Sequence, residues 1–163
     1  RLAKLSARAA LIKVGAVTEV QMKDKKLRLE DALNATRAAI EEGVIPGGGS
    51  TSIHLAEKLK VWAQENLLAD ELIGALMVQQ ALLVPTQRIA QNAGVISSII
   101  IDKIMNDSFE IGYDVISSSF RNMYVAGIID PAKVLRSAIQ NAASIASMVL
   151  TAECVILNNK NVT

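Results

Sequence analysis

The sequence predicts a mainly α-helical fold, and its composition and patterning support that prediction. Hydrophobic residues make up 51% of the 163 residues, whereas aromatic residues make up only 3%. The apolar side chains are therefore mostly aliphatic, and these suit close helix packing better than a β-sandwich. Apolar residues also recur at the spacing of an amphipathic helix over several long segments. We expect a helical bundle with a small β-hairpin and a terminal strand.

Charge and cysteine content exclude several classes of protein. The 17 basic and 16 acidic residues leave a net charge of +1, so the cationic surplus of a nucleic-acid or acidic-membrane binder is absent. The high apolar fraction excludes a disordered tail. A single cysteine forms no internal disulfide, which favours a reducing compartment. Because the chain starts at Arg1 without a signal-peptide pattern, we expect a piece of a longer intracellular protein.

The first two predicted elements are a strand and a long helix. Residues 9–17 form a short β-branched run, which predicts a strand paired with a partner outside this piece. Thr18 and Gln21 have the spacing of a capping box, so a helix should begin there. We expect it to run to Glu42, with Gly43 following its end. Acidic residues in its last turn oppose the helix dipole and indicate a partner surface at this end.

A glycine-rich stretch marks the clearest boundary in the chain. Residues 43–50 contain a proline followed by three glycines, which fit neither a helix nor a central strand. Ser50 or Thr51 is expected to cap the next helix. A further helix is predicted over residues 70–84, and Pro85 should break it before a third, short helix.

The pattern of the following segment is compatible with two kinds of secondary structure. Residues 95–105 fit a strand or a helix, since short apolar runs do not decide between the two. Residues 109–116 are predicted as a strand, with residues 117–119 as its turn.

The last long helix has a strong start signal. Asp130 is expected at its N-cap and Pro131 at its first position, where the missing N–H costs nothing. Its apolar face is so wide that we expect burial on most sides. Residues 154–157 predict a closing strand.

Three polar features are candidates for chemistry, and each has a structural alternative. The glycines 47–49 stand before a helix, where backbone N–H groups can approach a phosphate, but a flexible turn explains them as well. Asp31 lies on an apolar stripe of the long helix, where a carboxylate needs a partner. It could be a general base or a Mg²⁺-linked acid for hydrolysis, or it could pair with a lysine from elsewhere. Asp130 is explained by capping, although such a residue can also bond a ligand hydroxyl. His54 and Cys154 have no neighbours at the spacing of a metal or thiol site.

Five longer strings resemble the group I chaperonins, the GroEL family, and they occur in the family's order. They are KVGAVTE at 13–19, KKLRLEDALNATRAAIEEG at 25–43, PGGG at 46–49, GIIDPAKV at 127–134 and AIQNAAS at 138–144. The strings VIPGGG and RIAQNAG are more similar to cyanobacterial and plastid chaperonins, including the Rubisco-binding type. The resemblance covers essentially the whole chain.

The resemblance implies a domain organisation and a set of partners. Residues 1–8 would end the apical domain, residues 9–42 would be the C-terminal half of the intermediate domain, and residues 43–163 would be the C-terminal half of the equatorial ATPase domain. The family forms stacked seven-membered rings that enclose unfolded polypeptide clients under a co-chaperonin lid. We expect no nucleic-acid or membrane partner, and a plastid stroma or a bacterial or cyanobacterial cytoplasm rather than a mitochondrial matrix.

The resemblance also implies roles for individual residues in an ATPase. Asp31 occupies the position of the acid that promotes attack of water on the γ-phosphate. The glycine turn would contact the nucleotide, a segment starting at Asp114 the adenine, and Asp130 the ribose. The implied ATP-binding residues are Gly47, Gly48, Asp114, Val115, Ile116 and Asp130. The family's Mg²⁺ ligands would lie mainly outside this chain, so we expect the isolated piece to be inactive.

Two features, at three positions, depart from the family's pattern. Asp114 stands where the family usually has Asn, and a carboxylate has no N–H to donate to adenine. Ala7 and Arg8 replace a Gly-Gly hinge and do not visit positive φ freely. The alternative to a working subunit is therefore a divergent subunit with impaired nucleotide binding, or a non-catalytic helical interaction module.

Overall fold

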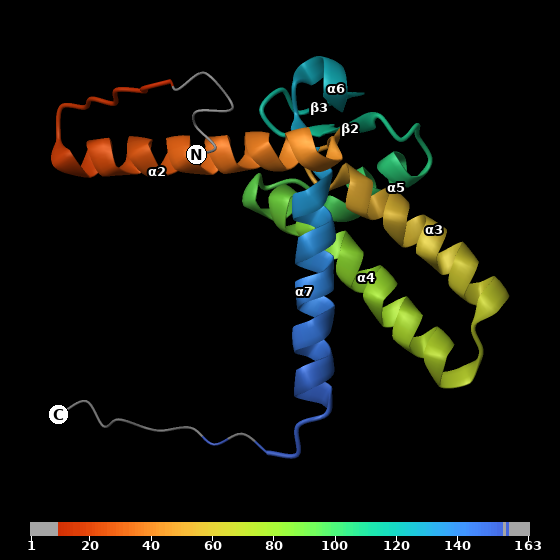
Figure 1. The fold of residues 1–163 in the computed structure, drawn as a ribbon. Helices are drawn as coiled ribbons and strands as arrows, with labels where there is room; N and C mark the ends of the chain where they lie inside the picture. The colour runs from red at the N-terminus through yellow and green to blue at the C-terminus, as the bar shows by residue number, and fades with distance from the viewer. Residues whose placement is uncertain (1–9, 155, 157–163) are drawn as a thin grey trace. The chain divides into compact units, whose positions relative to one another are not determined.

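A computed structural model describes residues 10–154 and 156, and these form two compact units, one ending at Arg37 and the other beginning at Ala38 (Figure 1). Helices make up 66% of the structure, which confirms the predicted mainly α fold. None of the helices in this part of the chain is both long and apolar enough to cross a membrane. Residues 1–8, the predicted end of the apical domain, lie outside the described residues.

The described residues form six helices and four short strands. The helices are α2 (Glu19–Glu42), α3 (Ser50–Asn66), α4 (Ala69–Asn92), α5 (Ser97–Met105), α6 (Met123–Ala126) and α7 (Ala132–Leu150). The strands are β1 (Val44–Pro46), β2 (Ile111–Asp114), β3 (Ser119–Asn122) and β4 (Ile129–Pro131). Along the chain these elements follow in the order α2, β1, α3, α4, α5, β2, β3, α6, β4 and α7. The strands form two separate antiparallel pairs, β1 with β4 and β2 with β3.

The first unit contains an extended segment and most of α2. The N–H of Gln21 donates to the Thr18 hydroxyl over 3.3 Å, so the predicted helix start is confirmed. Residues 10–17 pair with no strand within the described part of the chain, and position 9 lies outside the described residues. We expected the partner of this strand outside the given chain, so the strand stays a prediction. The apolar side chains of this segment line an open groove with α2.

The C-terminal end of α2 belongs to the second unit and is fixed to α7. Gly43 has a φ of +83° and donates its N–H to the carbonyl of Ala39 over 2.8 Å, which confirms the predicted helix end. Glu41 forms an ion pair with Lys133 of α7. Glu42 pairs with Arg136, whose guanidinium nitrogens lie 2.6 and 3.0 Å from the carboxylate oxygens. The partner surface expected at this end is therefore found within the chain itself.

The Glu42 pair should stabilise the fold in a pH-dependent way. The hydrogen bond from Arg136 lowers the pKa of Glu42 below its ordinary value of 4.5. Stability from the pair is therefore present above that value and is lost as the pH falls through the lowered pKa. We expect Arg136→Gln to lower the urea midpoint slightly at pH 7, because exposed pairs contribute little. The difference from the unsubstituted protein should shrink as the pH falls through the lowered pKa of Glu42. Arg88→Gln, which removes an exposed arginine that forms no ion pair in the described structure, is the control; equal losses for both variants at pH 7 would contradict the expectation.

The hydrophobic core of the second unit lies where α3, α4 and α5 meet the β2–β3 hairpin. Its buried members are Ile53, Ala90, Ile100, Ile101 and Ile104. The segment with two possible assignments is thus the helix α5, whose buried isoleucines recur at helical spacing. The predicted strand is found as β2, but over the shorter range Ile111–Asp114, and Ser119, predicted in the turn, begins β3 of the hairpin. The rings of Tyr113 and Phe120 pack edge-to-face on each other, with centroids 5.1 Å apart, and both contact this core.

The predicted break at Pro85 is wrong, because α4 continues through it. Inside a helix, proline removes its own N–H bond to the preceding turn and its ring crowds the carbonyl of that turn. On the C-terminal side of Pro85, Thr86 and Ala90 are buried and hold the helix in place. Tertiary packing here outweighs the local cost of the proline. The third, short helix that we expected is the last part of α4.

The start of α7 differs from its prediction by one residue. Asp130 lies in β4, where it pairs with Ile45, and Pro131 is the N-cap, with no side-chain cap bond. The N–H of Ala132 instead donates to the carbonyl of Gly43 over 3.1 Å. Strand pairing thus takes the residue that we expected to cap the helix.

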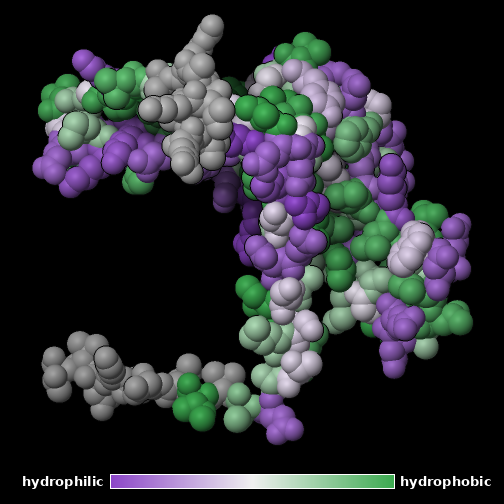
Figure 2. Space-filling model, in the orientation of Figure 1, coloured by the Kyte–Doolittle hydropathy of each residue, from purple (hydrophilic) through white to green (hydrophobic). Residues whose placement is uncertain are grey.

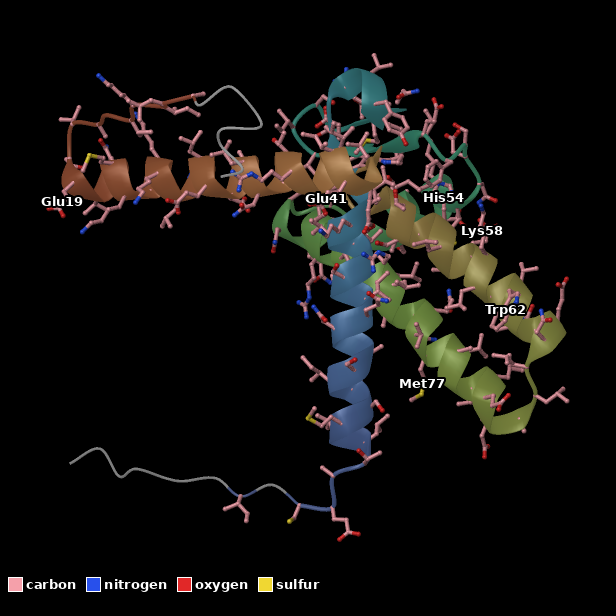
Figure 3. All side chains as sticks on the ribbon, viewed as in Figure 1. Glu19, Glu41, His54, Lys58, Trp62 and Met77 are labelled. Carbon is pink, nitrogen blue, oxygen red and sulfur yellow. The ribbon has the colours of Figure 1, made fainter. Side chains whose placement is uncertain are left out.

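Large apolar surfaces are exposed in the second unit. Contrary to the prediction of burial on most sides, α7 has no buried residue among those described. Figure 2 shows apolar side chains along its C-terminal half, and its most exposed are Ile145, Met148, Val149 and Leu150. Figure 3 marks Trp62 on α3 and Met77 on α4, which are 52% and 69% exposed. These apolar side chains are in contact with solvent in the described structure.

The end of the described chain shows no strand. Cys154 and Ile156 are exposed and in no regular element, and residues 155 and 157 of the predicted strand lie outside the described residues. A closing strand would need a partner chain segment, and none pairs with it here.

Candidate functional site

The candidate site is built around the glycine turn that joins β1 to α3. Gly48 and Gly49 have φ angles of +66° and +80°, a region that residues with a Cβ adopt at a cost. Gly49 is the N-cap of α3 and makes no side-chain cap bond, so the predicted capping by Ser50 or Thr51 is wrong. The left-handed glycine makes the turn that a capping side chain would otherwise support.

The hydroxyl groups after the turn bond backward to its carbonyls. Ser50 Oγ donates to the carbonyl of Gly47 over 2.9 Å, and Thr51 Oγ1 donates to that of Pro46 over 2.8 Å. Both side chains are buried, so neither hydroxyl is available to a ligand.

Two backbone donors at the turn remain free. Within the described residues, the N–H groups of Gly48 and Gly49 donate to no backbone or side-chain oxygen. They stand at the N-terminus of α3, where the helix dipole favours negative charge. The turn can therefore receive an anionic oxygen such as that of a phosphate.

Asp130 lies beside the first glycine of the turn. The N–H of Gly47 donates to the carbonyl of Ile128 over 2.9 Å, which extends the β1–β4 pairing into the turn. A Cβ placed on Gly47 would lie 3.3 Å from Cγ of Asp130. The Asp130 side chain is exposed and bonds to no described residue, so its carboxylate can accept a ligand's hydroxyl.

Met123 connects the turn to the β2–β3 hairpin. Its side chain is completely buried. A Cβ on Gly48 would lie 3.1 Å from its Cε, and a Cβ on Gly112 would lie 2.7 Å from its Cγ. The carbonyl of Tyr113 is 3.9 Å from the same Cβ position at Gly48. Both glycines are therefore required for this close packing, which sets the end of β2 next to the turn.

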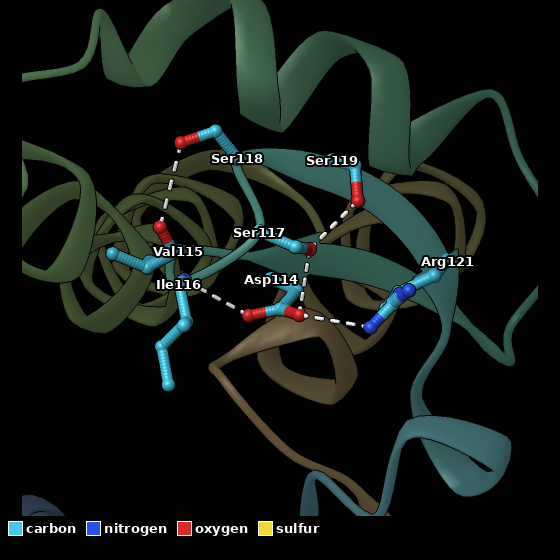
Figure 4. Close-up of polar contacts among 7 residues, drawn as sticks. All are labelled: Asp114, Val115, Ile116, Ser117, Ser118, Ser119 and Arg121. Carbon is cyan, nitrogen blue, oxygen red and sulfur yellow. Dashed lines mark hydrogen bonds and ion pairs between the residues drawn. The ribbon is translucent and has the colours of Figure 1, made fainter.

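Asp114 ends β2 and its buried carboxylate is held by its own hairpin (Figure 4). Oδ1 accepts the N–H of Ile116 over 2.9 Å. Oδ2 accepts the hydroxyl of Ser117 over 2.7 Å and the guanidinium of Arg121 over 3.2 Å. These donors, Ser117 first, lower the pKa of Asp114. The side chain of Ile116, by contrast, is 98% exposed.

Gly49 is closely covered by α4. A Cβ at this position would lie 2.3 Å from Oγ1 of Thr86, a separation that atoms do not tolerate. Thr86 is 3% exposed, and its hydroxyl has no hydrogen-bond partner in the described structure. The glycine turn is thus fixed from behind by the helix that we expected to break.

Asp31 belongs to the first unit, whereas the residues described above belong to the second. It is an exposed residue of α2 within the first unit, and its side chain bonds to no described residue. The apolar stripe on which we placed it is not buried, since α2 has no buried residue. The Asp31 carboxylate is therefore exposed to solvent.

Neither His54 nor a cluster of metal-binding side chains contributes to the candidate site in the described residues. His54 is buried against Phe109, with ring centroids 5.5 Å apart, and burial lowers its pKa. Its Nε2 has no partner among the described residues. These residues gather no group of three His, Cys, Asp or Glu side chains that fits a metal ion.

The structure thus brings together Gly47, Gly48, Asp130 and the end of β2 that carries Asp114, whereas Val115 and Ile116 follow in the adjacent turn. Sequence reasoning missed Thr86, Met123 and Arg121. Opposite charges at positions 114 and 121, across a predicted hairpin turn, are a signal that could have identified the Arg121 pair. No sequence signal indicates that Thr86 covers Gly49.

Comparison with known proteins gives one consistent result. The model of the TCP-1/cpn60 chaperonin family matches residues 3–160. The chain is 60% identical over 158 residues to "Chaperonin GroEL, chloroplastic" of Trieres chinensis. It is 62% identical to the proteins of that name from Cyanidium caldarium, over 158 residues, and Gracilaria tenuistipitata var. liui, over 156 residues. These alignments cover 96–97% of this chain and 30% of each relative.

A solved structure supports the same relationship. The crystal structure of a group III chaperonin in the open state superposes on 88% of this chain with a TM-score of 0.79 and 28% sequence identity. The match covers 30% of that chaperonin chain. The present chain therefore spans about a third of the length of the proteins that it resembles.

Proposed function

Because this chain belongs to the TCP-1/cpn60 chaperonin family, we propose that it is the C-terminal part of an ATP-dependent chaperone subunit. The complete subunit assists the folding of non-native polypeptides inside a ring cavity. Residues 9–42 belong to its intermediate domain and residues 43–163 to its equatorial ATPase domain. The chloroplastic origin of the similar proteins favours a plastid location.

One observation carries the proposed ATP site: a glycine turn with two free N–H groups lies beside a free carboxylate. The N–H groups of Gly48 and Gly49 would bind phosphate oxygens, because they are unpaired at a helix N-terminus. Asp130, next to Gly47, would accept a ribose hydroxyl. The segment Asp114–Ile116 would meet the adenine from the end of β2. Mg²⁺, bound mainly by residues outside this chain, would neutralise phosphate charge.

Asp31 is the proposed catalytic residue. Its carboxylate is exposed and unpaired within the described part, so it is available to take a proton from an attacking water. We propose that movement of α2 brings it to the nucleotide only when the pocket closes. Hydrolysis would then depend on a domain movement rather than on binding alone.

The exposed apolar face of α7 is consistent with an incomplete domain. In the complete subunit the remainder of the equatorial domain would cover it. Neighbouring subunits of stacked seven-membered rings, a co-chaperonin lid and unfolded clients are the proposed partners.

The proposal is tested by comparing the complete subunit with the isolated 163-residue chain. We expect the complete, assembled protein to release phosphate from ATP and to increase the yield of a refolding client. The isolated chain should do neither, because it supplies only part of the nucleotide site. Phosphate release by a coupled assay and recovery of client activity are the measurements.

Two results would contradict the proposal. Stoichiometric turnover by the purified 163-residue chain would show that the site is complete within it. A complete protein that neither binds nor hydrolyses ATP would favour the alternative of a non-catalytic helical module, with the glycine turn as a simple hinge.

A further inference from the structure

We propose that Asp114 and Arg121 form a positioning pair that shapes the turn Val115–Ser118, and that the Asp114 carboxylate itself does not bind the nucleotide. This inference rests on the proposed ATP site and refines it, because it separates the residue that supports the base-binding turn from the atoms that contact the base. Arg121 thereby gains a role that the family resemblance does not assign.

The pair is a cross-strand contact on one face of the hairpin. The register sets Asp114 opposite Ser119 and Gly112 opposite Arg121. Side chains alternate along a strand, so these four residues share a face, and Tyr113 and Phe120 lie on the other. The guanidinium of Arg121 reaches along this face to the Asp114 carboxylate, at 3.2 Å.

The carboxylate is occupied by its own hairpin. The Asp114 side chain is only 9% exposed, whereas that of Arg121 is 50% exposed. Three donors already converge on its two oxygens: the Ile116 N–H, the Ser117 hydroxyl and the Arg121 guanidinium. Ser117 also shares a hydrogen bond of 2.7 Å with Ser119 across the turn. A buried acceptor satisfied in this way offers little to a ligand.

The turn that the pair supports carries strain and projects outward. Ser118 has a φ of +49°, which is costly for a residue with a Cβ. The side chain of Ile116 is almost fully exposed at the tip. The Asp114 bonds to Ile116 and Ser117 hold the chain in this conformation from within. Any contact of the turn with adenine would then come from its backbone and from Ile116, with Asp114 acting through them.

The test measures ATP kinetics of the complete protein for Asp114→Asn, Arg121→Gln and the double variant. We expect each single variant to raise the KM for ATP by about two- to fivefold with kcat unchanged, as loss of one cross-strand charge pair implies. The double variant should show the same rise as either single variant, because both remove one interaction. Lys103→Gln is the matched control: it removes a cation that lies 4.1 Å from the Phe120 ring, on the opposite face.

Other outcomes would overturn the inference. If Asp114 bound the base directly, Asp114→Asn would change the preference for ATP over GTP in the presence or absence of Arg121, and the effects would add. If the pair only stabilised the hairpin, the melting temperature would fall while the KM stayed constant. A wild-type protein that binds no ATP would instead refute the proposed function, so the two failures are distinguishable.

Discussion

Replacing Asp31 by Ala in the complete subunit should almost abolish ATP turnover while ATP binding is retained. A positioned general base contributes about 10²- to 10⁴-fold to a rate, and we expect a loss of kcat in that range. Binding should be retained, because Asp31 lies outside the second unit, which contains the glycine turn, Asp130 and the hairpin. Single-turnover phosphate release and equilibrium binding of ATP separate the two effects.

The matched control for this experiment lies on the same helix. Asp24→Ala removes one carboxylate from α2, and its partner Arg28, 3.1 Å away, is also exposed. We expect this variant to keep normal turnover, since exposed helical ion pairs contribute little. If Asp31→Ala abolished ATP binding, Asp31 would have a structural role. Equal losses of kcat for Asp31→Ala and Asp24→Ala would show that the effect comes from the loss of a negative charge on α2 and not from a specific role of Asp31.

Replacing Gly49 by Ala should cause the largest loss of stability among single substitutions in the glycine turn. The new alanine would have to keep a backbone φ of +80°, and its Cβ would also collide with Thr86 Oγ1, 2.3 Å away. Left-handed backbone costs a residue with a Cβ about 1–2 kcal/mol. Overpacking typically adds about 1–3 kcal/mol. The melting temperature and urea midpoint of the complete subunit measure the sum.

Gly43 provides a control that separates strain from collision. Its φ of +83° is nearly the same, but a Cβ there would meet no atom within 4 Å. Gly43→Ala should therefore show only the backbone cost. A second comparison is Gly49→Ala combined with Thr86→Ala, which removes the colliding hydroxyl and should recover part of the loss. Equal destabilisation by Gly43→Ala and Gly49→Ala would show that the contact with Thr86 has no energetic weight.

Features of local origin were predictable from the sequence. The long helix α2 follows from the Thr18 cap at its start and Gly43 at its end, and both were found where the residue types indicated. The hairpin at 111–122 follows from its alternating strand and serine-rich turn. In these elements the stabilising contacts lie within a few residues of one another, so the pattern contains most of the information.

Features that depend on distant contacts were mispredicted. Pro85 should end a helix by local rules, yet packing of Thr86 and Ala90 continues it. Asp130 has the signature of an N-cap, yet pairing of β4 with Ile45 places it in a strand. In each case a contact with another part of the chain outweighs local propensity.

The candidate site was accessible from the sequence only through the family resemblance. The glycines by themselves also fit a simple hinge, and Asp130 by itself fits a cap. Their juxtaposition arises from the β1–β4 pairing and the Gly47 N–H bond to Ile128, which link distant segments. The role of Asp31 remains a prediction, because it belongs to the other unit.

The uncovered side of α7 affects how this polypeptide behaves when produced by itself. Val149 is 68% and Leu150 85% exposed to water, and no described element shields them. Proteins with exposed hydrophobic surfaces of this kind aggregate as their concentration rises. The isolated chain is therefore expected to precipitate as its concentration rises, and a protein segment that covers this face of α7 should keep it in solution.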